Sequence, residues 1–250
     1  MPELSIVWPA LIAGLLVTAT HAPLGVQVLK RGIVFIDLAV AQIAGLGVVL
    51  ADALGFEPHG VAVQVAALSA AVAGALLLNW TDKVWPEVQE AVIGVSFIVA
   101  ANIAILLLAT NVHGAEHLKD LLVGQILWVS PGVLAYVALI YAVLLAAWFG
   151  FGVRMGRAGF YLLFACTVTV SVQLVGIYLV FTTLIAPALA TRHFARHRLA
   201  ACYALGAVGY AVGLGLSLVS DLPPGPLVVC CMTALGLVVL LLTSRGRIPT

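Results

Sequence analysis

Long apolar runs separated by short polar segments fill almost all of the 250-residue chain. The runs are continuous over about 20 residues and lack the apolar–polar alternation of a half-buried strand. Such runs are typical of membrane-spanning helices, which satisfy their backbone hydrogen bonds internally. We expect spans within residues 4–29, 32–54, 61–80, 91–110, 133–149, 160–191, 199–220 and 227–243.

The run 160–191 is the one whose length fits no simple span. It exceeds one crossing but falls short of the roughly 40 residues that two crossings need. Either Gly176 breaks it into two short half-helices, or it crosses once and leaves Arg154 and Arg157 outside the cell. The chain then has eight full spans, or nine if the broken run crosses twice.

The composition supports this reading, because 64% of residues are hydrophobic and 8% are charged. A soluble domain carries about 25% charged residues. We therefore expect residues 1–250 to form one all-α, polytopic transmembrane domain with the lipid bilayer as its main solvent. The net charge of +1 gives no basis for nucleic-acid binding. Arginines 192, 196 and 198 mark a cytoplasmic loop.

Common catalytic signatures are missing from the sequence. It contains no Gly-x4-Gly-Lys-Ser/Thr, no His-Glu-x2-His and no Gly-x-Ser-x-Gly. No lysine follows a glycine, so the chain cannot build a P-loop of its own. ATP-driven work would have to come from a partner chain. The four cysteines lie in apolar runs and are interpreted as small core residues.

Ionisable side chains inside the apolar runs are the first candidates for function. Asp37 lies in GIVFIDLAVAQIAGLG, and a charge near the membrane centre usually faces a bundle interior or a transport pathway. It could instead lie at the membrane boundary and pair with Lys30 or Arg31. Gln42 is about 140° round the helix from Asp37 and suits a helix-joining hydrogen bond or a pathway role.

Histidines supply the other candidates. His21 lies deep in the first run, where an imidazole can join helices or bind a transition metal, and Pro23 can interrupt the helix. The segment NVHGAEHLKD carries His113, Glu116 and His117, a donor set that suits zinc or manganese, although a polar loop has the same composition.

The loop TRHFARHR combines two histidines with three arginines. Because cationic neighbours oppose metal binding, we interpret it as a basic docking surface or lipid-facing anchor.

Five sequence blocks follow one another along the chain: PLGVQVLKRGIVFIDLAVAQIAGLG, EAVIGVSFIVAANIAILL, HLKDLLVGQILWVSPGVL, VGIYLVFTTLIAPALATR and GLGLSLVSDLPPGPLVV. In this order they resemble the membrane permease subunits of the metal-ion ABC importers, a family that carries zinc, manganese or iron. The resemblance covers nearly the whole chain and implies the fold of a type II ABC-importer permease in a bacterial cytoplasmic (inner) membrane.

The resemblance also implies partners and roles. Two copies of the chain would form the pore, two cytoplasmic ATPase subunits would drive it, and an extracytoplasmic binding protein would deliver the metal. The chain would be no enzyme and hold no cofactor, only a transported divalent ion. The ATPase would dock on the segment that follows the Pro-Ala block, which carries Thr191, Arg192, His193, Arg196, His197 and Arg198.

The sequence departs from the family at the metal path. The family's early helix commonly carries Asp followed four residues later by His, but Ala41 lies four residues after Asp37, and aligning the glycine turn puts Gln42 in that place. His21 could supply the missing imidazole, or the selection could lie in the binding protein. A permease for a metal chelate, a secondary transporter driven by an ion gradient and a membrane-embedded enzyme remain alternatives.

Overall fold

The computed structural model describes residues 2–57, 60–108, 122–124, 126–151, 154–194, 196–220 and 222–244. These residues are almost entirely helical and include no strand. Eight of the helices are long and apolar enough to cross a membrane, and α8 is a shorter apolar helix. The expected polytopic all-α fold of about eight spans is therefore confirmed. The chain divides into two compact units.

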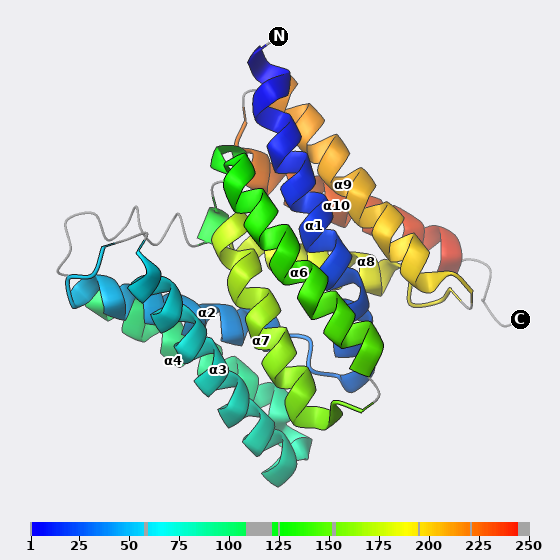
Figure 1. Ribbon diagram of the computed structural model, residues 1–250. Coiled ribbons are helices and arrows are strands. Elements are labelled where there is room, and N and C mark those ends of the chain that lie inside the picture. The colour runs from blue at the N-terminus through cyan, green and yellow to red at the C-terminus, as the bar shows by residue number, and fades with distance from the viewer. Residues whose placement is uncertain are drawn as a thin grey trace, which may run out of the picture. The chain divides into compact units, whose positions relative to one another are not determined.

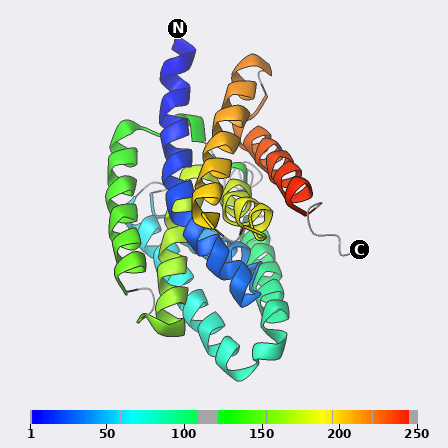
Figure 2. The same ribbon diagram turned by 90° about the vertical axis from the view of Figure 1, so that its right-hand side faces the viewer.

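The first unit comprises Met1–Arg31, Val123–Tyr141 and Leu174–Thr250. It contains α1 (Pro2–Arg31), α8 (Ile177–Ala190), α9 (Arg198–Ser220) and α10 (Pro224–Ser244), with the short η2 (Ile126–Trp128). Helix α1 packs against α8 and α9, and α10 packs against the same two helices (Figures 1 and 2). Three segments that are distant in sequence thus build one helical core.

The second unit comprises Gly32–Leu122 and Ala142–Gln173. It contains α2 (Ile36–Ala53), α3 (Val61–Val84), η1 (Pro86–Val88) and α4 (Gln89–Leu108), and α2 packs against both α3 and α4 (Figure 1). Two further helices, α6 (Pro131–Phe151) and α7 (Gly156–Val175), contribute residues to both units.

The long run after residue 154 is broken at Gly176, as one of the two expectations proposed. Gly176 has φ +84° and separates the 20-residue α7 from the 14-residue α8. A Cβ on Gly176 would lie 2.5 Å from the backbone nitrogen of Gly124, which itself has φ +71°. Only glycine fits this backbone-to-backbone approach without strain. Helix α7 begins at Gly156 rather than near residue 160, and this extra turn makes it long enough to span.

Pro23 does not interrupt α1, contrary to the sequence-based expectation, because α1 is continuous from Pro2 to Arg31. A proline has no N–H to donate to the carbonyl four residues earlier, here Ala19. The hydroxyl of Tyr203 on α9 donates to that carbonyl at 3.3 Å. A side chain 184 residues away thus satisfies the group that the proline leaves free.

Candidate functional site

The first candidate, His21, is fully buried on α1 within the first unit. Its Nδ1 lies 3.0 Å from the carbonyl oxygen of Val17 and 3.0 Å from the hydroxyl of Thr20. Its Nε2 is buried and has no hydrogen-bond partner in the structure. Buried polar atoms are nearly always paired, so this nitrogen is an exception that calls for an explanation.

The second candidate, Asp37, lies in the first turn of α2 within the second unit and is 1% exposed. The partial positive charge of a helix N-terminus favours a carboxylate at this place. The Oδ1 atom is buried and has no hydrogen-bond partner among the described residues. Asp37 is therefore neither at an exposed boundary nor fully satisfied. A cation could supply the missing interaction.

Gln42 lies five residues further along α2 and is 7% exposed. Asp37 and Gln42 both belong to the second unit, whereas His21 belongs to the first. The third set, His113, Glu116 and His117, lies outside the described residues. Within the described part of the chain, no group of three or more His, Cys, Asp or Glu side chains could hold a metal ion.

Glu90 is a polar contact that the sequence analysis did not single out. Its Oε1 accepts a hydrogen bond of 3.2 Å from the backbone N–H of Phe35, immediately before α2. Its Oε2 is buried, and no residue in the described part of the chain bonds to it. Glu90 thus joins the start of α4 to the connection that leads into α2. The only signal in the sequence was its position in the EAVIG block.

A buried polar cluster surrounds the neighbouring Gln89, which is 3% exposed. Its Nε2 donates to the carbonyl of Leu78 at 2.9 Å and to the hydroxyl of Tyr161 at 3.3 Å. Its Oε1 accepts from the Thr81 hydroxyl at 2.9 Å. The cluster joins α3, α4 and α7 within the second unit. Its pairing suits a structural role rather than a ligand role.

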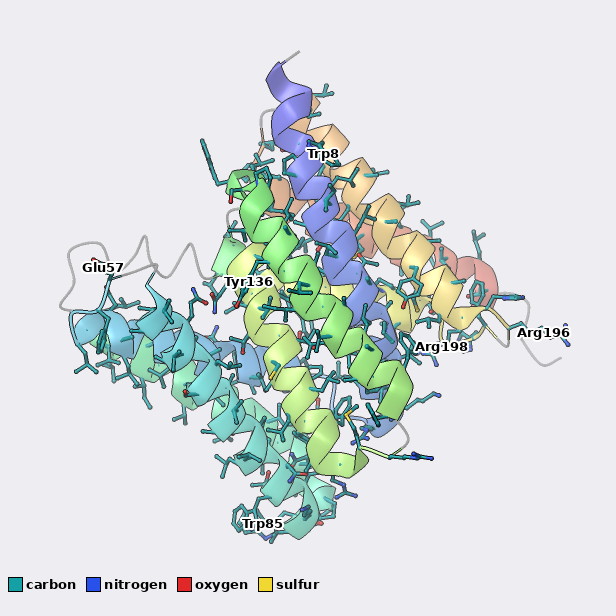
Figure 3. The ribbon with its side chains drawn as sticks, in the orientation of Figure 1. Trp8, Glu57, Trp85, Tyr136, Arg196 and Arg198 are labelled. Carbon is teal, nitrogen blue, oxygen red and sulfur yellow. The ribbon has the colours of Figure 1, made fainter. Side chains whose placement is uncertain are left out.

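The α8–α9 connection carries the expected docking residues, and burial divides them. Arg192, Arg196 and His197 are exposed, whereas Thr191 is 1% exposed. The hydroxyl of Thr191 donates to the Pro187 carbonyl at 2.8 Å. Figure 3 shows Arg196 projecting away from this connection, with Arg198 closer to the helices.

Arg198 is tied to the end of α8. Its Nη2 donates to the carbonyl of Ala188 at 3.0 Å, and a cation near the C-terminus of a helix also interacts favourably with the helix dipole. Cys202 adds a further contact, with its sulfur 3.0 Å from the Thr191 hydroxyl. Thr191, Arg198 and Cys202 therefore hold the end of α8 against α9. Of the exposed basic residues, Arg192 donates from Nε to Nε2 of His193 at 3.0 Å, and Arg196 extends into solvent.

A protein-family model and a curated relative both match nearly the whole chain. A model of the ABC 3 transport family matches residues 3–155 and 145–243. The high-affinity zinc uptake system membrane protein ZnuB of Haemophilus influenzae is 26% identical over 271 residues, which cover 97% of this chain and 99% of that protein.

Two solved structures share the fold. PsaBC from Streptococcus pneumoniae, in complex with Fab, superposes on this chain with a TM-score of 0.75 at 19% sequence identity. The match covers 93% of this chain and 90% of the matched PsaBC chain. An inward-facing structure described as a metal-chelate type ABC transporter superposes with a TM-score of 0.70 at 16% sequence identity. The match covers 96% of this chain and 86% of the transporter chain. These two likenesses concern the fold.

Proposed function

The chain belongs to the ABC 3 transport family, and from that membership we propose that it is the membrane-spanning permease of an ATP-driven importer for a divalent transition-metal ion. The observation that carries the proposal is the family match over nearly the whole chain. The zinc uptake relative, which aligns end to end, makes zinc the first cargo to test, ahead of manganese and ferrous iron.

The energy for transport comes, in this proposal, from a separate ATPase. The sequence has no P-loop, and its three lysines, Lys30, Lys83 and Lys119, do not follow glycines. Two cytoplasmic ATPase subunits, a second copy of the permease and an extracytoplasmic metal-binding protein complete the machine. The chain itself is a transport component rather than an enzyme.

A membrane topology follows from the helix order and the positive charges. If α7 and α8 leave and return to the same side, ten of the eleven lysines and arginines fall on one face, and Lys119 falls on the other. The positive-inside rule makes the first face cytoplasmic. Helix α1 then starts outside, and the connections α1–α2, α3–α4 and α8–α9 lie in the cytoplasm of a bacterial inner-membrane protein.

Asp37, His21 and Gln42 are the proposed pathway residues. The unpartnered Oδ1 of Asp37 and Nε2 of His21 are buried donor atoms that a passing cation could use. Gln42 offers an amide oxygen on the same helix as Asp37. His113, Glu116 and His117 remain candidates for a metal contact at the extracytoplasmic side in this topology.

The exposed part of the α8–α9 connection is the proposed docking surface for the ATPase. Arg192, Arg196 and His197 are exposed, and three neighbouring basic side chains suit an acidic rim on the partner. Arg198 and Thr191 hold the shape of the connection, whereas His193 bonds to the exposed Arg192 and belongs with the docking residues.

A metal chelate is the second candidate cargo. The likeness to a metal-chelate type ABC transporter and the absence of the Asp–His pair at Asp37 favour it. The end-to-end alignment with a zinc uptake protein favours the bare ion.

The experiment is elemental analysis of cells that lack this gene, grown under starvation for zinc, manganese or iron. We expect one metal to fall and to return when the intact gene is supplied. Chelated cargo would instead restore growth only when the metal is offered as its complex. No change in any metal in the deletion strain would contradict the proposed function.

A further inference from the structure

We infer that His21 is a nitrogen ligand for the transported cation and makes this permease favour zinc, and to a lesser degree ferrous iron, over manganese. The inference rests on the proposed function, which supplies the cation. It concerns a residue outside the Asp–His pair that the family commonly carries. Three features of His21 lead to it: the position of its proton, its unpartnered nitrogen and its rigid support.

The surroundings of Nδ1 fix the position of the proton. The Thr20 hydroxyl donates to the Val17 carbonyl at 3.0 Å, so its remaining lone pairs face Nδ1. The Val17 carbonyl oxygen also lies 3.0 Å from Nδ1 and can only accept. With the Thr20 hydroxyl and the Val17 carbonyl both acting as acceptors, we assign the proton to Nδ1. The lone pair of the neutral ring is then on Nε2.

The Nε2 atom is fully buried, and none of the residues that the structure describes donates a hydrogen bond to it. His21 lies ten residues before the end of α1 at Arg31, which corresponds to about 15 Å along the helix axis. That depth is about half the thickness of the hydrocarbon core. With Arg31 taken as the membrane boundary, the nitrogen lone pair lies near the middle of the hydrocarbon core.

The arrangement at Nδ1 is the one that metal-binding histidines use. A ligating imidazole almost always donates its other N–H to a carbonyl, a carboxylate or a water, which fixes the ring and raises its basicity. The Val17 carbonyl has that position here. Both contacts of Nδ1 are made within α1, to Thr20 and Val17, so neither of them joins α1 to another helix.

The helix that carries His21 is held firmly. The hydroxyl of Tyr203 on α9 donates to the Ala19 carbonyl, two residues before His21. The hydroxyl of Thr18 donates to the Gly14 carbonyl at 2.8 Å, within the same helix. A ligand on a supported helix keeps its direction better than one on a loop.

The donor type determines which cation benefits. Imidazole nitrogen suits zinc and iron, whereas manganese binds nitrogen donors most weakly of the divalent first-row metals and suits oxygen donors such as Asp37. Removing His21 should therefore affect zinc far more than manganese. Removing the carboxylate of Asp37 should affect both.

The test compares initial uptake of radioactive zinc and manganese in cells that carry the complete transporter. His21→Gln keeps a similar volume but lacks the imidazole, and Tyr203→Phe is the matched control because it removes a hydrogen bond to the same helix. Loss of an outer-shell partner alone lowers metal affinity about 10–100-fold. We expect His21→Gln to lower zinc uptake by about tenfold or more and manganese uptake by less than about twofold, with Tyr203→Phe leaving the ratio unchanged.

A second readout separates a ligand from a structural residue. X-ray absorption of the purified complex loaded with one zinc ion should show an imidazole ligand that His21→Gln removes. If His21→Gln does not accumulate in the membrane, His21→Met allows the same comparison of zinc spectra with an apolar side chain in place of the imidazole. An unchanged zinc-to-manganese ratio, or an unchanged zinc spectrum, would overturn the inference. If the intact transporter carries no metal at all, the proposed function fails instead.

Discussion

Arg196 and Arg198 are separated by one residue, yet the structure predicts different consequences of removing them. Arg198 donates to the Ala188 carbonyl at 3.0 Å, and a hydrogen bond from a charged group contributes about 1.5–3 kcal/mol when buried. Because the side chain is half-buried, we expect Arg198→Ala to cost about 1–2 kcal/mol. For a chain of this size the midpoint of thermal unfolding should fall by about 2–8 °C.

Arg196 is exposed and bonds to no other described residue. Arg196→Ala should therefore leave the unfolding midpoint unchanged. If Arg196 meets an acidic group on the ATPase, its loss should weaken association by the 0.2–1 kcal/mol of an exposed ion pair, or about 1.4–5-fold. That loss should shrink as salt rises above about 0.15 M, because exposed charges are then screened.

The assay measures thermal unfolding and ATPase association of purified permease in detergent, at low and moderate salt. Lysine replacements at the same positions serve as controls, because they keep the charge but lose the guanidinium geometry. Arg196→Lys should associate almost normally, while Arg198→Lys should recover only part of the stability. The reasoning would be refuted by an Arg198→Ala variant of normal stability whose association falls as far as that of Arg196→Ala.

Three further variants test the fold that supports the site. Gly176→Val should reduce the amount of folded protein in the membrane, because φ is +84° and no space exists for a Cβ. A strained backbone position costs about 1–3 kcal/mol of folding free energy, and we expect at least that loss. Gln89→Leu should lower the unfolding midpoint by several degrees, because it removes three buried hydrogen bonds that join α3, α4 and α7. Tyr203→Phe should destabilise the otherwise unchanged chain by about 0.5–1.5 kcal/mol. The same substitution should cost less in a chain that already carries Pro23→Ala, because the alanine N–H then donates to the Ala19 carbonyl.

The helices of this protein are readable from its sequence because lipid imposes one requirement on every span. Apolar runs of about 20 residues, a break at Gly176 and polar loops predicted the observed helices to within a turn at most ends. The start of α7 was missed because Arg157 reads as a loop residue. In the structure its guanidinium pairs with Asp82 at 3.3 Å and bonds the Asp82 carbonyl at 2.9 Å, so the helix can begin earlier.

The sequence was less informative wherever a distant residue decides the outcome. Pro23 suggested a break in α1, and only the tertiary hydrogen bond from Tyr203 explains why the helix continues. Glu90 was not singled out from the sequence, because nothing local indicates that it accepts a hydrogen bond from the N–H of Phe35. The same limit applies to the basic loop, where the composition cannot separate the exposed Arg196 from the anchored Arg198.

The chemistry of the candidate pathway was predictable by residue type and not by geometry. Asp37 and His21 were identified as ionisable groups in apolar runs, and the structure places both in buried positions. That each keeps one unpartnered atom could not be read from the sequence. The unpartnered atom turns a buried polar residue into a candidate ligand.

The most direct test of the central claim is zinc transport by the purified system in lipid vesicles. The permease would be reconstituted with its ATPase, and the metal-bound binding protein would be supplied on the opposite side of the membrane. We predict zinc movement that requires ATP hydrolysis, stops with a non-hydrolysable analogue and falls sharply in Asp37→Asn at equal protein level. Zinc movement that ignores ATP but follows an ion gradient would contradict the account and identify a secondary transporter.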